Sequence, residues 1–363
     1  MTRLHELFDE AGQSPWLDNL RRSWITSGEL ARWVESGVRG LTSNPSIFEK
    51  AIGGSDAYDE QFHDLVASGA STTDIYWELV TTDIEAALAV LRPVYDASNG
   101  LDGYVSVEVA PSLARDTAGT IAAARALDTA IDEPNLYVKI PGTAEGLEAI
   151  ETMIAEGRSI NVTLLFSVER YDQVIEAYLS GLERAEGDLS DISSVASFFI
   201  SRVDSAVDAR LDAIATPEAL ALRGKAAVAQ AKLAYALFRE RFSGPRWEAL
   251  EARGARVQRP LWASTSTKNP DYPDTLYVDS LIGPDTVNTL PDATLEAFVD
   301  HGTVARTIDT GLDEARSVLD AVRAVGVDLD EVAATLESEG VASFEKSFDD
   351  LLATLETKRT AVR

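Results

Sequence analysis

The sequence alternates short apolar or β-branched runs with longer helical stretches. Runs typical of strands lie near residues 14–19, 38–43, 104–109, 136–141, 159–165, 193–200, 259–264 and 276–282. Helical patterns lie between them, for example over residues 73–95, 144–155, 168–182 and 217–242. Strands that alternate with helices form parallel βαβ units, and eight such units favour a closed barrel over an open sheet. The alternation therefore predicts an α/β fold, a (β/α)8 TIM barrel.

Two segments exceed what a simple barrel needs. The length of 363 residues fits either one elaborated barrel or two ordinary domains. Residues 45–100 are too long for one crossover helix, so we interpret them as a helical insertion after the second strand. Residues 292–363 also have a helical pattern, and we expect the last part to pack across the barrel. Because no repeat or Pro-rich linker divides the chain, we predict a single domain over residues 1–363.

Apolar patterning argues against a membrane protein. Hydrophobic residues make up 45% of the chain and charged residues 25%, close to averages for globular domains. No apolar stretch approaches the roughly 18 residues that span a bilayer. The first residues, MTRLHELFDEAGQ, lack the apolar core of a signal peptide. We therefore expect a cytoplasmic protein with no membrane partner.

The charge and the metal-ligand inventory exclude further classes. A formal net charge of −28 argues against a nucleic-acid partner, because such binding draws on clustered Lys and Arg. The chain has no cysteine, and its three histidines, His5, His63 and His301, are far apart. We therefore expect neither a metal nor another cofactor. Any anionic substrate would need a local concentration of positive charge.

Lys139 lies inside the apolar run LYVKIPGTAEG, residues 136–146, which is an unusual place for an ammonium group. The chain has only seven lysines beside 25 arginines. Burial disfavours the charged form of an amine and lowers its pKa, which lets a lysine attack a carbonyl and form an imine. A salt-bridged core lysine, or one that reaches the barrel rim, would give the same pattern.

Four consecutive predicted strands carry polar side chains on one alternate face. Strand side chains alternate with a period of two, so the apolar residues of each run point the other way. The pairs that share a face are Ser106 with Glu108, Tyr137 with Lys139, Asn161 with Thr163, and Ser197 with Phe199. A buried polar group without a hydrogen-bond partner destabilises the fold by roughly 1–3 kcal/mol. One interpretation of the pattern is therefore a buried hydrogen-bond network that makes the fold specific. Their convergence favours a catalytic barrel interior.

Two further segments place polar residues near the strand ends. GLTSNPSIF, residues 40–48, has Asn44 before Pro45, whose fixed φ makes a stiff turn at the active-site end of such barrels. SPWLDNL places Asp18 late in the first strand. Asp18 and Glu108 would then flank the amine, each suited to one proton-transfer role. GTAEG lacks the spacing of a phosphate loop, so we expect Thr143 there to be a helix N-cap.

With these segments in view, the sequence resembles the transaldolases, Schiff-base-forming (β/α)8 barrels of the class I aldolase type. GLTSNPSIF is similar to the family's first signature, LYVKIPGTAEGLEAIE to its lysine signature, and INVTLLFS to its Asn-x-Thr strand. VSVEV and SFFISRVD follow in family order. WLDNL and LWASTSTKNP look more like the longer bacterial subfamily than the short fructose-6-phosphate aldolase-like proteins.

The resemblance implies a role for each candidate residue. Lys139 would form an imine with C2 of a ketose phosphate, Glu108 would move protons through a water held by Thr163, and Asp18 would deprotonate the C4 hydroxyl. The groups implied for substrate binding are Asn44 and Asn161 on the dihydroxyacetone hydroxyls, Ser197 beside them, and Arg202 on the phosphate.

The segment after the seventh predicted strand departs from the family pattern. Many members have a second phosphate-binding arginine there, whereas this chain has ASTSTKN. We expect Ser264 and Ser266 to contact phosphate and Lys268 to replace the missing charge. An ordinary loop cation is the alternative for Lys268.

Taken over the chain, the resemblance implies a transaldolase of the pentose phosphate pathway. It would move a dihydroxyacetone unit from sedoheptulose 7-phosphate to glyceraldehyde 3-phosphate, giving erythrose 4-phosphate and fructose 6-phosphate. Its partners would be phosphorylated sugars, and its oligomeric state is not predicted. A class I aldolase, a non-catalytic sugar-phosphate-binding barrel and a glycoside hydrolase using Asp18 and Glu108 are the alternatives. The last leaves Lys139 without a role.

Overall fold

Eight parallel strands close into one barrel in the computed structural model, which describes residues 2–362. Each strand pairs with its sequence neighbours, and β1 closes the ring against β8. The strands are β1 (Gln13–Leu17), β2 (Leu41–Thr42), β3 (Val105–Glu108), β4 (Leu136–Pro141), β5 (Ile160–Leu165), β6 (Ser194–Phe199), β7 (Arg259–Ala263) and β8 (Thr286–Leu290). The predicted α/β barrel is confirmed.

Helices surround this barrel, and the apolar outer faces of the strands pack against them. Val138, Ile140 and Val162 are fully buried on those faces. α8 begins where the Thr143 side chain accepts a hydrogen bond from the Gly146 backbone N–H, as predicted for an N-cap. The surrounding helices are α1 (Arg3–Asp9), α2 (Arg22–Thr26), α3 (Glu29–Glu35), α7 (Thr117–Ile131), α8 (Ala144–Ala155), α9 (Val168–Arg184), α10 (Ser201–Ile214), α11 (Pro217–Leu220), α12 (Ala226–Arg241), α13 (Gly244–Glu251) and α14 (Leu276–Asp279).

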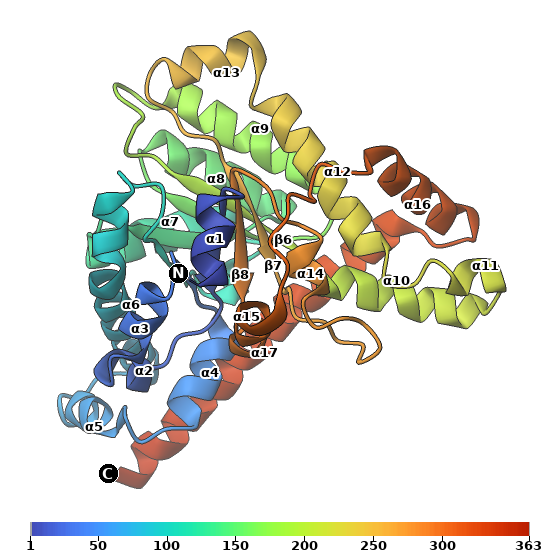
Figure 1. Ribbon diagram of the computed structural model, residues 1–363. Helices are drawn as coiled ribbons and strands as arrows, with labels where there is room; N and C mark the ends of the chain where they lie inside the picture. Colours follow the sequence, from blue (N-terminus) through green and yellow to red (C-terminus); the bar gives the residue numbers. More distant parts are fainter. Residues whose placement is uncertain (1, 363) are drawn as a thin grey trace.

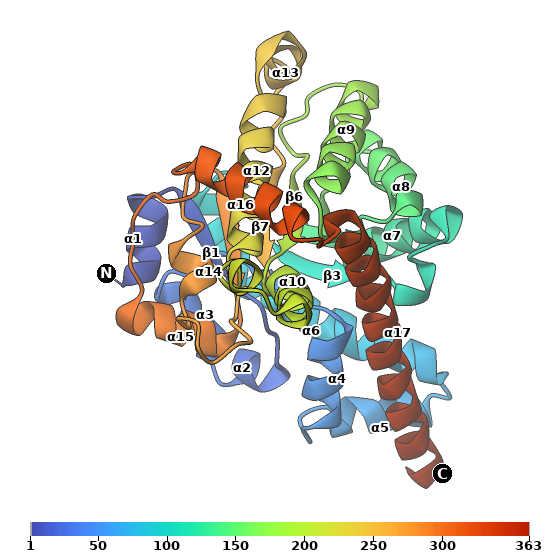
Figure 2. The ribbon, with the colours of Figure 1, turned by 90° about the vertical axis from the view of Figure 1, so that its right-hand side faces the viewer.

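The two long helical segments meet at one end of the barrel. Residues 45–100 form α4 (Pro45–Gly53), α5 (Asp59–Ala67) and α6 (Thr72–Ala97), and the C-terminal segment forms α15 (Asp292–His301), α16 (Leu312–Ala324) and α17 (Leu329–Val362). α4, α5 and the end of α17 lie together at the lower end of Figure 1, and Figure 2 shows α17 alongside α4. α17 also contacts α6, α10 and β5. The organisation as a single domain stays a prediction.

The eighth strand is not where the sequence placed it. Residues 276–282 form α14 and a turn, and the strand is β8, Thr286–Leu290. Tyr277, Val278 and Leu281 are buried at helical spacing, so their apolar run is typical of a short helix as well as of a strand. β8 reads TVNTL, whose Thr and Asn side chains weaken the apolar signal although all five residues are buried.

A helix predicted over residues 217–242 is interrupted. It forms α11 and α12, separated by a turn in which Gly224 has φ +69°, a conformation that favours glycine. The Tyr272 ring packs on Gly224, where a Cβ atom would lie 2.7 Å from the ring Cζ. The break therefore makes room for a side chain of the loop between β7 and α14.

The barrel interior is layered. Its amino-terminal half holds aromatic rings and the buried ion pair of Arg259 with Asp102. There Tyr137 stacks on Tyr104 with 4.1 Å between centroids and lies 6.0 Å from the Trp16 ring. Polar residues occupy the carboxyl half, where TIM-barrel active sites lie. Among the described residues, no helix is long and apolar enough to span a membrane.

Candidate active site

A chamber of about 120 Å³ lies at the carboxyl end of the barrel. Phe344 of α17 lines it from above the strands, so a helix from the far end of the sequence helps to enclose it. Nine of the predicted site residues line the chamber: Asp18, Asn44, Lys139, Thr163, Ser197, Arg202, Ser264, Ser266 and Lys268. The barrel therefore gathers most of the candidate residues at one place.

Lys139 and Glu108 form a buried ion pair beside the chamber. Their strands are adjacent and in register, and 3.2 Å separates Lys139 Nζ from Glu108 Oε2. Lys139 Nζ also donates a hydrogen bond of 3.0 Å to the Ser43 carbonyl oxygen. Burial raises the pKa of Glu108, and the charges of Lys139 and Arg202 oppose that rise. A carboxyl group with a raised pKa can both give and accept a proton near neutral pH.

Asp18 follows β1 directly and points into the chamber. Its backbone N–H donates to the Leu290 carbonyl at 2.8 Å, which extends the β1–β8 ladder by one residue. Thr42 Oγ1 donates to Asp18 Oδ1 at 2.7 Å. Burial raises the pKa of Asp18, and the Thr42 hydrogen bond and the charge of Lys139 oppose the rise. The site thus holds a second carboxyl group suited to general base catalysis.

Asn161 is fully buried, lies opposite Lys139 in the ladder between β4 and β5, and does not line the chamber. Its amide donates to Ser106 Oγ at 3.0 Å, and its carbonyl oxygen accepts from Ser197 Oγ at 2.8 Å. Both ends of the amide are therefore used within the protein. Asn161 fixes the orientation of Ser197, whose side chain does reach the chamber.

Thr163 lies at an irregular point of β5. The register of β5 against β6 shifts between Val162 and Leu165, and Leu164 has φ +61°, a strained conformation for a branched side chain. The Thr163 hydroxyl is buried with no hydrogen-bond partner in residues 2–362. Apart from its ion pair, the Glu108 carboxylate likewise lacks a protein hydrogen bond in the described chain. Both groups can therefore bond a substrate atom or a water.

Asn44 and Pro45 begin α4. Asn44 is the N-cap, and its side-chain oxygen accepts the Ile47 N–H at 3.0 Å. Pro45 occupies the first helical turn, where its fixed φ suits the helix. Because the oxygen is used for capping, the Asn44 amide N–H groups remain for the chamber.

Arg202, near the start of α10, is held by aromatic rings. Its guanidinium carbon lies 5.1 Å from the Phe199 ring centroid and 5.9 Å from that of Phe344. Burial lowers the pKa of Arg202, and the carboxylates Asp18 and Glu108 oppose this shift. The rings support the guanidinium without using its N–H donors.

Ser264, Ser266 and Lys268 belong to the loop after β7. Ser264 has φ +56°, and its hydroxyl lies 2.9 Å from Ser201 Oγ at the start of α10. Lys268 Nζ donates to Ser266 Oγ at 2.7 Å. Burial and the charge of Arg202 both lower the pKa of Lys268. In residues 2–362, no group of three His, Asp or Glu side chains is placed to hold a metal ion.

A protein-family model described as Transaldolase/Fructose-6-phosphate aldolase matches residues 15–355. The chain belongs to this family. Transaldolase from Frankia alni is 53% identical over 350 residues, covering 95% of this chain and 94% of that protein. Transaldolase from Thermobifida fusca is 54% identical over 354 residues, covering 96% of each. Transaldolase 2 from Streptomyces avermitilis is 49% identical over 363 residues, covering 99% and 98%.

In this transaldolase-family barrel, the chamber residues that the sequence reasoning missed include Thr42, Thr289 and Phe344. Thr42 shares a strand face with Asn44, so the period of two could have identified it. Thr289, whose hydroxyl lies 2.7 Å from that of Thr42, was missed because β8 was misplaced. Phe344 gave no local signal, since only the packing of α17 brings it to the chamber.

Proposed function

We propose that this family member is a transaldolase of the pentose phosphate pathway, acting through an imine on Lys139. It would transfer dihydroxyacetone from sedoheptulose 7-phosphate to glyceraldehyde 3-phosphate. The observation that carries the proposal is the buried Lys139 amine at the chamber, with Glu108 and Asp18 as its acid-base groups. The relatives named transaldolase over most of their length support the same activity.

The first half of the reaction joins Lys139 to the donor. Glu108 takes a proton from the Lys139 ammonium group, and the neutral amine attacks C2 of the ketose. A C–N bond forms, the C=O π bond breaks, and the oxygen takes up the proton that the nitrogen loses. Glu108 gives a proton to the resulting hydroxyl group through a water held by Thr163, and the hydroxyl leaves as water. The product is a protonated imine. The raised pKa of Glu108 suits this proton transfer.

The second half breaks and remakes a carbon–carbon bond. Asp18 removes the proton from the C4 hydroxyl, the C3–C4 bond breaks, and its electron pair moves through the imine to form an enamine. Erythrose 4-phosphate leaves. The enamine C3 then bonds to C1 of glyceraldehyde 3-phosphate, Asp18 returns the proton to the new alkoxide, and water hydrolyses the imine to release fructose 6-phosphate and the free amine.

Substrate binding divides between the two ends of the chamber. Asn44 and Ser197 would hydrogen-bond the dihydroxyacetone hydroxyls, with Asn161 acting through Ser197. The phosphate would bind Arg202, whose fork of N–H donors matches phosphate oxygens. Ser264, Ser266 and Lys268 would complete that end.

An aldolase is the nearest alternative, because the family model covers both activities. Initial rates with fructose 6-phosphate, measured with and without erythrose 4-phosphate, distinguish the two. We expect turnover that requires the acceptor, whereas release of free dihydroxyacetone at the same rate without acceptor would identify an aldolase. The ion pair between Glu108 and Lys139 argues against a glycoside hydrolase. The cytoplasmic location stays a prediction.

A further inference from the structure

Unpaired cations concentrate at one place on this acidic protein. Within residues 2–362, nearly every Lys and Arg side chain lies within 4 Å of a carboxylate or donates to a backbone carbonyl. Four do neither: Lys50, Arg202, Lys225 and Lys268. Three of these four line a common pocket, and Lys225 does not. The chain has a net charge of −28, yet these three neighbouring cations have no carboxylate partner. This arrangement destabilises the unliganded protein and favours the binding of an anionic ligand.

The common pocket is the outer entrance of the active-site chamber. Its volume is about 880 Å³, and it shares Asp18, Asn44, Arg202, Lys268 and Pro291 with the inner chamber. Lys50, in the last turn of α4, lines the outer pocket only. Besides burial and Arg202, the charge of Lys50 also lowers the pKa of Lys268, so the lysines are near enough to repel each other. The two lysines and Arg202 therefore act on the same space.

The overlap of the two pockets places the phosphate next to this space. Lys139, to which the three-carbon fragment is attached, lines only the inner chamber, whereas Arg202 and Lys268 line both pockets. A phosphate bound by Arg202 and Lys268 would therefore lie where the two pockets meet, beside the part of the outer pocket that Lys50 lines. There an exposed lysine on a helix can approach phosphate without desolvation of a buried charge.

We propose that Lys50 binds the phosphate of the sugar substrates together with Arg202 and Lys268. The inference rests on the proposed transaldolase function. α4 would then serve both ends of the substrate, with Asn44 at its N-cap facing the dihydroxyacetone unit and Lys50 at its last turn facing the phosphate.

The test compares Lys50→Ala with Lys225→Ala, which removes an unpaired, exposed lysine at the start of α12 that lines neither the outer pocket nor the inner chamber. For Lys50→Ala we expect the KM for fructose 6-phosphate to rise about tenfold, as for loss of one charge-assisted contact in solvent. The kcat should stay within about twofold. Lys50→Arg should restore the KM, and Lys225→Ala should match wild type. Rates with unphosphorylated fructose as donor should not change.

Wild-type KM values in Lys50→Ala, or an equal loss with fructose, would overturn the inference. Calorimetric binding of inorganic phosphate to the wild type and to each variant keeps this result separate from the proposed function. One result would separate the two proposals: the wild type binds phosphate and Lys50→Ala binds it more weakly, but neither the wild type nor any variant transfers dihydroxyacetone. In that case the proposed function fails and the phosphate site stands. If phosphate binding is the same in Lys50→Ala and Lys225→Ala, the phosphate site fails whatever the activity.

Discussion

Glu108 lies directly opposite Lys139 in the ladder between β3 and β4, and its carboxylate is 3.2 Å from the Lys139 amine. The strand register sets this pair, so the rigid barrel holds the amine and the carboxylate in place. Both side chains are buried, and burial raises the pKa of Glu108. Removal of Lys139 would leave a buried carboxylate without its counter-charge.

Lys139→Met should therefore make stability depend on pH through Glu108. The folded-state pKa of Glu108 is already above its ordinary value and rises further without Lys139, so protonated Glu108 is favoured in the fold. Its contribution to stability is full at low pH and is lost as pH rises through the folded-state pKa. Denaturant unfolding should show a loss of about 3 kcal/mol for Lys139→Met at pH 8 and much less at pH 5.

The double variant Lys139→Met/Glu108→Gln is the control for this prediction. It has no carboxylate at position 108, so its stability relative to wild type should change little between pH 5 and pH 8. The same pH dependence in the single and double variants would show that Glu108 is not the group responsible.

Thr42→Val should move the acid limb of the activity profile. Asp18 must be ionised to act as a base, and the Thr42 hydroxyl holds down a pKa that burial raises. A hydrogen bond to a charged group contributes ~1.5 kcal/mol. Its loss should therefore raise the pH at which kcat/KM falls on the acid side of the profile by about one pH unit. Thr42→Ser keeps the hydroxyl and should keep the wild-type limb. An unshifted limb in Thr42→Val would exclude Asp18 as the titrating base.

Arg202→Ala should separate phosphate recognition from chemistry. Its guanidinium is supported by Phe199 and Phe344 and has no carboxylate within 4 Å in the described chain. We expect the KM for fructose 6-phosphate to rise about a hundredfold, because a bidentate charged contact is lost. The rate with unphosphorylated fructose should be nearly unchanged. Equal effects on both donors would refute a phosphate-binding role.

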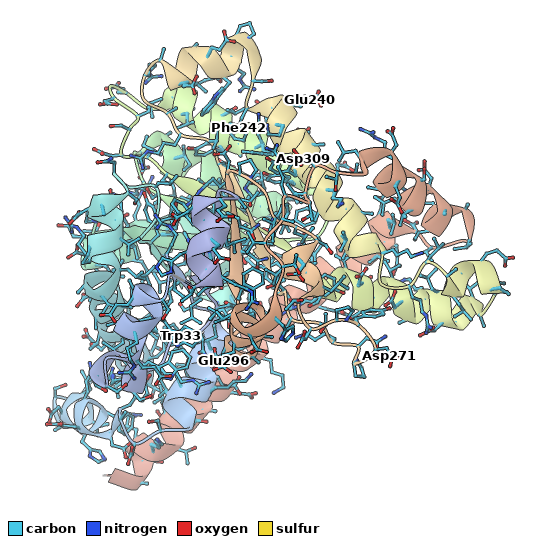
Figure 3. The ribbon with its side chains drawn as sticks, in the orientation of Figure 1. Trp33, Glu240, Phe242, Asp271, Glu296 and Asp309 are labelled. Atoms are coloured by element: carbon cyan, nitrogen blue, oxygen red, sulfur yellow. The ribbon has the colours of Figure 1, made fainter. Side chains whose placement is uncertain are left out.

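Tyr272→Phe should loosen the loop that carries Ser264, Ser266 and Lys268. Tyr272 Oη donates to Asp208 Oδ2 at 2.6 Å, and Asp208 Oδ1 accepts the Gly224 N–H at 2.9 Å, so the loop is tied to α10. We expect the KM for fructose 6-phosphate to rise about threefold, for loss of one hydrogen bond. Asp271→Asn is the matched control, since Asp271 lies at the outer edge of the same loop (Figure 3). If both variants behave alike, the Tyr272 contact does not position the loop.

The sequence predicted the polar interior because a strand has a period of two. Glu108, Lys139 and Ser197 lie in strands whose alternate residues are strongly apolar, so one face of each strand was clearly marked. The same period could not show that the Asn161 amide is hydrogen-bonded to Ser106 and Ser197. Such pairings depend on strand tilt and register, which local sequence does not encode. The contact of Asn161 with substrate stays a prediction.

Two other features depend on tertiary packing. The run at residues 276–282 contains enough apolar residues for a strand, and only the burial of the polar strand β8 shows which segment closes the barrel. Phe344 reaches the chamber because α17 crosses the barrel end against α4 and α10. Contacts between residues so far apart in sequence leave no periodic signal near Phe344.

Borohydride trapping tests the role of Lys139 most directly. The protein is incubated with fructose 6-phosphate, reduced and digested with trypsin, which does not cleave after a modified lysine. We predict a reduced dihydroxyacetone adduct on an uncleaved peptide of residues 126–158, which contains Lys139 between the cleavage sites at Arg125 and Arg158. Lys139→Met should carry no adduct. An unmodified chain under turnover conditions, or an adduct on another lysine, would contradict the imine mechanism.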